Sequence, residues 1–145
     1  MRIVLQRIAR AEVRVGGEAV ASCARGFLLL VGVGAGDDGS EIAKLAEKVA
    51  GLRVFEDDEG KMNLALGDVA GEVLVVPNFT LHGDTSRGRR PSWVRAAAPE
   101  VAEGRVEAFA AALEGLGVRV HRSAFREHME VDLVNDGPVT MVLEG

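Results

Sequence analysis

The sequence has little of what would place a protein in a membrane or in an oxidising compartment. Its 145 residues include one cysteine, Cys23, which cannot form an internal disulfide and has no cysteine partner for a metal site. No apolar run approaches the roughly 20 residues of a membrane span. Charge appears at Arg2 and Arg7, too early for a signal peptide. We therefore expect a cytoplasmic protein that does not contact a membrane.

Positive charge is also scarce. The net charge of -5 and the isoelectric point near 5.2 exclude a general nucleic-acid coat, because non-specific affinity requires many neutralised phosphates. One local basic patch contains Arg87, Arg89, Arg90 and Arg95, around residues 91–93. Such a loop could hold a phosphate and stack a base, although the plainer interpretation is a solvated surface.

The composition is 48% hydrophobic and 27% charged, which is typical of a globular protein. We find no repeat, linker or composition shift along the chain. The sequence therefore predicts a single domain over residues 1–145, large enough to bury about two-thirds of its unfolded surface.

Apolar periodicity predicts an α+β fold. Two helices are predicted at 38–52, capped by Asp or Ser, and at 99–116, opened by Pro99. The apolar run 27–33 predicts a central strand buried on both faces. Further strands are predicted at 3–10, 11–15, from 19, 52–55, 73–76, 118–121, 129–134 and 139–143. This order indicates a mainly antiparallel, strongly curved sheet.

Three patterns argue against metal or nucleotide chemistry. The glycine-rich segment 31–36 lacks the ending of a phosphate-binding loop, so it is interpreted as a strand end. His82, His121 and His128 have no metal-ligand spacing and are interpreted as surface or capping residues. The acidic segment 57–59 is more simply a charged turn than a cation site. We expect no metal in the site.

Thr80 and His82 form a candidate catalytic pair, because they follow the buried strand predicted at 73–76. If the strand continues, both side chains point to one face and the imidazole could activate the hydroxyl. Same-face Cβ atoms stand about 6 to 7 Å apart, so the side chains would have to lean together. Two alternatives stay open: Thr80 is structural, or backbone N–H groups after Pro77 hold a developing oxyanion.

The Gly137-Pro138 corner lies between the last two apolar runs. Proline removes a backbone donor and interrupts a sheet ladder, whereas glycine permits a close backbone approach to a ligand. The plainer interpretation is a hairpin turn that closes an edge strand. The sequence leaves the cis or trans state of this X-Pro bond open.

Five sequence blocks resemble those of the D-aminoacyl-tRNA deacylase family, in the same order and over essentially the whole chain. They are residues 2–10, 52–64 (LRVFEDDEGKMNL), 74–81, 88–93 (GRRPSW) and 134–140 (VNDGPVT). Five blocks at compatible spacing are much harder to obtain by chance than one Gly-Pro corner.

The resemblance implies a homodimer of small barrel-like α+β subunits, with the active site at the subunit interface and no cofactor. It implies a carboxylic ester hydrolase that binds the 3′ end of aminoacyl-tRNA. The expected reaction releases tRNA and amino acid from D-aminoacyl-tRNA and from glycine mischarged on tRNA, as chiral proofreading in translation. The alternative is a non-catalytic RNA-binding module that has kept the fold.

The resemblance also implies roles for the corner and its neighbours. Gly137 and Pro138 match a Gly-cisPro element that reaches into the partner's active site and leaves no room for an L side chain. Arg7 matches an arginine that braces this element, and Asn135 is assigned with it as a supporting residue.

The catalytic segment is expected at Asn78, Phe79 and Thr80, where the resemblance places backbone N–H groups and a threonine around the scissile carbonyl. In this view the 2′-hydroxyl of the terminal adenosine assists the attack. The chain departs from the family pattern here, because Pro77-Asn78 replaces the usual Ser-Gln and His82 replaces a frequent tyrosine. Arg87, Arg89 and Arg90 are expected to contact tRNA phosphates.

Overall fold

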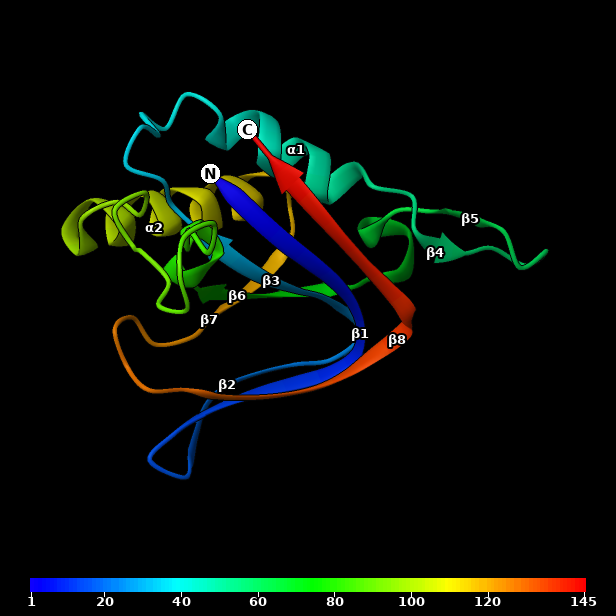
Figure 1. Ribbon diagram of the computed structural model, residues 1–145. Helices are drawn as coiled ribbons and strands as arrows, with labels where there is room; N and C mark the ends of the chain where they lie inside the picture. Colours follow the sequence, from blue (N-terminus) through cyan, green and yellow to red (C-terminus); the bar gives the residue numbers. More distant parts are fainter.

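A six-stranded mixed sheet forms the frame of the protein in the computed structural model, which describes all residues 1–145 (Figure 1). The strand order is β2-β1-β3-β6-β7, and β8 pairs with β1 outside this path. The strands are β1 (Arg2–Val15), β2 (Glu18–Cys23), β3 (Gly26–Gly32), β6 (Glu72–Pro77), β7 (Arg119–Arg122) and β8 (Glu130–Glu144). The sheet curves strongly, so that its ends approach one another as a nearly closed barrel.

Strand direction divides the sheet into two parts. All pairings of β1 are antiparallel, whereas β3 pairs in parallel with β6 and β6 with β7. Parallel neighbours need long crossovers, and the two main helices lie in these connections. The predicted barrel-like α+β fold with two main helices is confirmed, and β3 is the central strand of the path, as expected.

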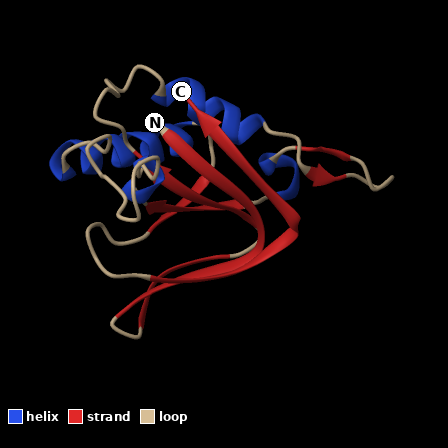
Figure 2. Cartoon of the chain, in the orientation of Figure 1, coloured by secondary structure: helices blue, strands red, loops and turns tan.

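The two helices, α1 (Ile42–Gly51) and α2 (Pro99–Gly115), lie together on one side of the sheet (Figure 2). Helix α2 begins at Pro99 as predicted, because proline at the first helical position sacrifices no hydrogen bond. Helix α1 begins later than predicted, after Glu41 and without a side-chain cap. The Asp38 carboxylate instead accepts a hydrogen bond from the amide of Ser40 in the preceding loop.

Two hydrophobic clusters cover the two faces of the sheet. The larger contains 20 buried residues between the sheet and the helices, including a stacked pair of rings, Phe27 and Phe55, 5.2 Å apart. The smaller contains seven buried residues, among them Ile8, Leu28 and Leu74, inside the curve of the barrel. The central strand is buried on both faces because it contributes to both clusters.

A small hairpin projects from the body of the protein (Figures 1 and 2). It consists of β4 (Phe55–Glu56) and β5 (Met62–Leu64), and the short helix η1 (Leu66–Val69) follows it. The turn between the strands is stabilised by the Asp57 carboxylate, which accepts hydrogen bonds from two backbone amides. No helix of the fold combines the length and apolarity needed to cross a membrane.

Strand β8 bends sharply midway along its path beside β1 (Figure 1). The pairing runs from Gln6 with Thr140 to Ile8 with Asn135, so residues 136–139 stand opposite Arg7 alone. The prediction of two separate strands at 129–134 and 139–143 was therefore wrong, because both segments belong to β8. The predicted interruption of the hydrogen-bond ladder at the Gly-Pro corner is confirmed. Likewise, 3–10 and 11–15 form one strand, β1.

The segment after β6 is a 3-10 helix, η2 (Phe79–His82), and its reading as a continued strand was wrong. Pro77 ends the ladder, and the Asn78 side chain caps the next turn by accepting a hydrogen bond from the Thr80 amide. Asn78 is itself anchored, because its backbone N–H donates to the carbonyl of Val31 at 2.8 Å. A tight turn therefore replaces the strand immediately beyond the sheet edge.

Candidate active site

A pocket of about 580 Å³ opens where β3 and β6 end, and ten of its 16 lining residues are hydrophobic. Asn78 and Phe79 lie on its wall, next to Pro77. The other wall comes from the start of α2 and from the segment between β7 and β8. In parallel sheets, ligands characteristically bind at the carboxyl ends of strands, so this is the leading candidate site.

The turn η2 presents polar groups beside this pocket. The Thr80 hydroxyl and amide both donate to the Asn78 carboxamide oxygen, so that Asn78 fixes the threonine side chain. The backbone N–H of Phe79 has no acceptor within the chain. The first N–H groups of any helix lack intrahelical partners, and this one is free to donate to a ligand.

Aromatic rings border the same turn. Phe79 and Trp93 meet edge to face with ring centroids 5.3 Å apart, and both are substantially exposed. Trp93 also packs over Gly83, where a Cβ atom would come within 2.7 Å of the ring. Exposed aromatic faces are suited to contact with a nucleobase. The glycine thus allows the indole to lie against η2.

The His82 imidazole makes no hydrogen bond to Thr80. The Thr80 hydroxyl bonds to Asn78, while the imidazole packs against Gly32 and Gly34 beside the Asp37 carboxylate. The hypothesis of a hydroxyl nucleophile with an imidazole base relied on same-face geometry in a strand, and η2 has no such geometry. The hydroxyl therefore has no imidazole base bonded to it.

The Gly137-Pro138 corner is exposed, its peptide bond is cis, and neighbouring side chains hold it in place. Arg7, the one buried charged side chain, donates to the carbonyl of Asp136 at 3.0 Å and to the carbonyl of Val54 at 2.6 Å. The side-chain amide of Asn135 donates to the backbone carbonyls of Arg7 and Val139, at 2.9 and 3.1 Å. These bonds fix the backbone on both sides of the corner.

Within one chain, the corner and η2 are far apart. Arg2 contacts η2 through the carbonyl of Leu81, whereas Arg7 contacts the residue before Gly137. Arg2 and Arg7 are five positions apart on β1, so their Cα atoms are separated by roughly 17 Å at about 3.4 Å per residue. The sequence-predicted residues thus form two groups, and a single chain does not bring them together.

The third predicted group, Arg87, Arg89 and Arg90, lies on an exposed loop without ion pairs to carboxylates. The loop is closed by paired backbone hydrogen bonds between Asp84 and Ser92. Hydrogen bonds from Ser86 hold the pKa of the Asp84 carboxyl below its ordinary value, with a smaller contribution from Arg95. The loop base is therefore ordered while its arginines stay free.

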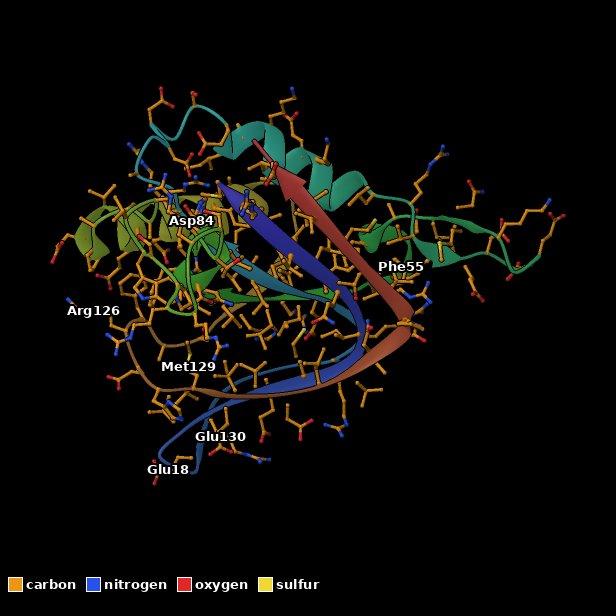
Figure 3. All side chains as sticks on the ribbon, in the orientation of Figure 1. Glu18, Phe55, Asp84, Arg126, Met129 and Glu130 are labelled. Atoms are coloured by element: carbon orange, nitrogen blue, oxygen red, sulfur yellow. The ribbon has the colours of Figure 1, made fainter.

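The sequence did not reveal the wall opposite Phe79. Residues 125–129, between β7 and β8, line the pocket, and Figure 3 labels Arg126 and Met129 there, with Asp84 at the base of the arginine loop. Arg126 has a φ of 60°, which is uncommon outside glycine and marks a tight local turn. A polar segment between two strands carries no sequence signal for this role, because the closure of the barrel positions it.

The curved mixed sheet, the apolar pocket at its strand ends and the unpaired Phe79 N–H of η2 define a small barrel-like α+β protein with a ligand pocket. The chain belongs to the D-Tyr-tRNA(Tyr) deacylase family, whose model matches residues 4–144. It is accordingly a deacylase, as the five sequence blocks implied.

Relatives named D-aminoacyl-tRNA deacylase agree with this assignment. Those of Symbiobacterium thermophilum and Roseiflexus castenholzii are 52% and 53% identical over 99% of this chain, covering 95% and 92% of theirs. A solved structure of the c-Myc DNA unwinding element binding protein has a TM-score of 0.93 at 36% identity, covering 100% of this chain and 99% of that chain. A probable eukaryotic D-amino acid tRNA deacylase shares the fold at 16% identity, with a TM-score of 0.83 over 98% and 97% of the two chains.

Proposed function

We propose that this protein hydrolyses the ester that joins a D-amino acid, or mischarged glycine, to the 3′ end of tRNA. The observation that supports this proposal most directly is the backbone N–H of Phe79, which has no acceptor within the chain and lies at the edge of a largely apolar pocket. The pocket has room for the terminal adenosine, and Phe79 and Trp93 offer aromatic surface to its base. The ester carbonyl then lies next to η2.

In the proposed reaction, water attacks the ester carbonyl and the bond to the ribose oxygen breaks. The Phe79 N–H donates to the oxyanion that develops on the carbonyl. The vicinal 2′-hydroxyl of the adenosine assists the attack, because no imidazole or carboxylate is bonded to Thr80. Asn78 and Thr80 position this turn, and the products are tRNA with a free ribose hydroxyl and the amino acid.

Chirality is proposed to be set by the Gly137-Pro138 corner of a second copy of the chain. Its carbonyls would lie against the substrate α-carbon and leave no space for an L side chain, whereas hydrogen in glycine and the D arrangement fit. The support is its exposed position, its bracing by Arg7 and Asn135, and its distance from η2 of the same chain.

A homodimer would give β8 a partner surface. Val134 and Val142 on this strand are 41% and 61% exposed, and apolar side chains in such positions favour association.

Arg87, Arg89 and Arg90 are proposed to contact phosphates near the acceptor end, which lets an acidic protein bind tRNA locally. We infer that the enzyme acts in the cytoplasm.

A pair of variants at one position tests the oxyanion contact. Phe79→Pro removes the N–H, and proline suits this first position of η2 after the extended Asn78. Phe79→Ala keeps the N–H and loses the same ring. We expect Phe79→Pro to hydrolyse D-Tyr-tRNA at least about 100-fold more slowly than Phe79→Ala. Equal rates in two folded variants would refute the oxyanion role.

Mixing variants tests the shared site. Phe79→Pro and Gly137→Ala subunits each lack a different half, so mixed dimers should contain one intact site of two. An equal mixture after subunit exchange should recover about a quarter of the wild-type activity, because about half of the dimers are mixed. No recovery, with exchange verified by mass spectrometry, would refute the interface site.

The rival function is a non-catalytic RNA-binding module, which the Pro77-Asn78 departure motivates. Incubation with D-Tyr-tRNA, L-Tyr-tRNA and Gly-tRNA separates the two. Release of D-tyrosine and glycine without release of L-tyrosine supports the deacylase, whereas binding without release supports the module. Release of L-tyrosine at the rate of D-tyrosine would refute chiral selection.

A further inference from the structure

A second cluster of reactive side chains lies at the opposite end of the parallel strands from the candidate active site. Cys23 ends β2, Glu72 begins β6 and His121 lies on β7. Their ligand atoms, one from each residue, all lie within 4.8 Å of one another. From Glu72 to Pro77 the strand spans roughly 16 Å at about 3.3 Å per residue, so the cluster is separate from the pocket.

Hydrogen bonds orient the three groups toward one another. The Nε2 atom of His121 lies 2.8 Å from Oε2 of Glu72, while Arg119 holds the other carboxylate oxygen at 3.1 Å. The Ala24 amide lies 3.3 Å from Oε2, and the Cys23 thiol donates to the Ala24 carbonyl at 3.2 Å. One carboxylate oxygen of Glu72 therefore faces the imidazole, while the exposed Arg119 side chain pairs with the other.

Without a bound metal ion, the surroundings of Cys23 disfavour ionisation of its thiol. Burial, and then the charge of Glu72, raises its pKa to about 12. A divalent cation between thiolate and carboxylate would replace their repulsion by attraction, and coordination deprotonates a thiol outright.

We propose that Cys23, Glu72 and His121 bind one zinc ion. Sulfur, imidazole nitrogen and carboxylate oxygen are the ligands that Zn²⁺ takes in proteins, at about 2.0 to 2.3 Å. Tetrahedral angles put such atoms about 3.3 to 3.6 Å apart. The present separations need side-chain movements of only about 1 Å to reach this geometry. Glu72 also lines a neighbouring pocket of about 440 Å³, and a water molecule is proposed as the fourth ligand.

Zinc binding at this site involves no change of oxidation state. The Cys23 proton leaves to solvent as the S–Zn bond forms. The neutral imidazole coordinates through Nε2 and carries its proton on Nδ1, and the Glu72 carboxylate stays ionised. Because the three ligands come from β2, β6 and β7, the ion would tie these strands together at the end remote from η2. Its proposed role is structural.

The contrasting explanation is that Cys23 only fills the smaller core cluster while Glu72 pairs with His121 and Arg119. Metal binding separates the two. Protein without a histidine tag is stripped with EDTA and titrated with Zn²⁺ against a chromophoric chelator, and in parallel with Co²⁺ under anaerobic conditions.

We expect one metal ion per chain and a thiolate-to-cobalt charge-transfer band in the near ultraviolet. Cys23→Ala should abolish the band, and His121→Gln should weaken zinc binding at least tenfold, because each loses a ligand. His128→Gln is the matched histidine control and should bind zinc like the wild type. Zinc should raise the Tm of the wild type but not of Cys23→Ala.

The absence of a cobalt–thiolate band in the wild-type protein would overturn the proposal, and this measurement needs no folded variant. Equal zinc affinity in wild type, Cys23→Ala and His121→Gln would overturn it as well. Hydrolysis of D-Tyr-tRNA should be the same within about twofold for the zinc-loaded and stripped enzymes at a temperature where both are folded. Activity that depends on zinc would refute the structural role while leaving the deacylase assignment in place.

Discussion

Adding one methyl group at Gly137 should damage catalysis far more than folding. Gly137 has a φ of +139°, and a Cβ atom there would lie 2.6 Å from the Val139 amide nitrogen and 2.8 Å from the Val139 Cγ2. Ordinary contacts begin near 3.4 Å, so the backbone of the corner must move by several tenths of an ångström. The Nη2 atom of Arg7 would lie 3.4 Å from the same Cβ, which is already ordinary van der Waals contact.

The size of the effect follows from this displacement. A misplacement of about 1 Å in a positioning element costs on the order of 100-fold in rate, so Gly137→Ala should lower kcat for D-Tyr-tRNA by about that factor. Strain at a φ reserved for glycine costs about 1 to 3 kcal/mol, which should lower the Tm by a few degrees. The assay is release of labelled D-tyrosine, with thermal unfolding measured on the same samples.

Gly104→Ala is the matched control. Gly104 lies within α2, is exposed and has open space around its Cα. The same methyl group should there raise stability by about 0.5 to 1 kcal/mol and leave the rate unchanged. A folded Gly137→Ala enzyme with the activity of Gly104→Ala would refute the reasoning that the corner excludes L side chains by close approach.

Three further predictions concern single side chains. Thr80→Ala should slow release of D-tyrosine less than about tenfold, because the tRNA hydroxyl assists the attack. Arg7→Met should lower the free energy of unfolding in urea by about 2 to 4 kcal/mol, because two carbonyls lose their buried donor. Burial acts to raise the pKa of Glu72, but hydrogen bonds from Ala24 and His121 outweigh it and lower the pKa. This ionised carboxylate stabilises the protein above pH 4.5, its ordinary pKa, and the stabilisation is lost as pH falls through the lower folded-state pKa. With EDTA present, the stability deficit of Glu72→Gln in urea should therefore be full near pH 7 and disappear in acid.

Each of these has a result that contradicts it. Complete loss of turnover in folded, substrate-binding Thr80→Ala would indicate a protein nucleophile. Unchanged stability of Arg7→Met would mean that water replaces the guanidinium at no cost. A Glu72→Gln deficit that persists unchanged to low pH would show that the amide disturbs packing and that ionisation is not the cause.

Local chemistry in the sequence determined where elements begin and which residues are special. Pro99 opens α2, the apolar run at 27–33 becomes the doubly buried β3, and Pro77 ends β6. The same local chemistry identified the Gly137-Pro138 corner as a break in the last ladder. These features were predictable because turn and cap preferences act over a few residues.

The relative directions of the strands, and where each strand continues or stops, were decided by tertiary pairing. β1 runs unbroken through Arg2–Val15 because it pairs with β3 and β8 early and with β2 and β8 later. η2 forms a turn because Asn78 caps it and the sheet has ended, although its sequence also fits a strand. No periodicity encodes the parallel β3–β6 and β6–β7 pairs, which depend on the long crossovers over residues 33–71 and 78–118.

From the sequence alone came the fold class, because apolar periodicity is local, and the family, because five blocks of residues match it in order. Arg7, Asn78 and Phe79 were singled out through that resemblance, whereas Gly137-Pro138 was also marked by its own turn chemistry. Tertiary structure alone separated the Gly-Pro corner from η2 of its own chain and built the pocket wall from residues 125–129. It also brought the Cys23 thiol, whose sequence neighbours hold no second ligand, to Glu72 and His121. Such juxtapositions follow from sheet closure, which no local pattern records.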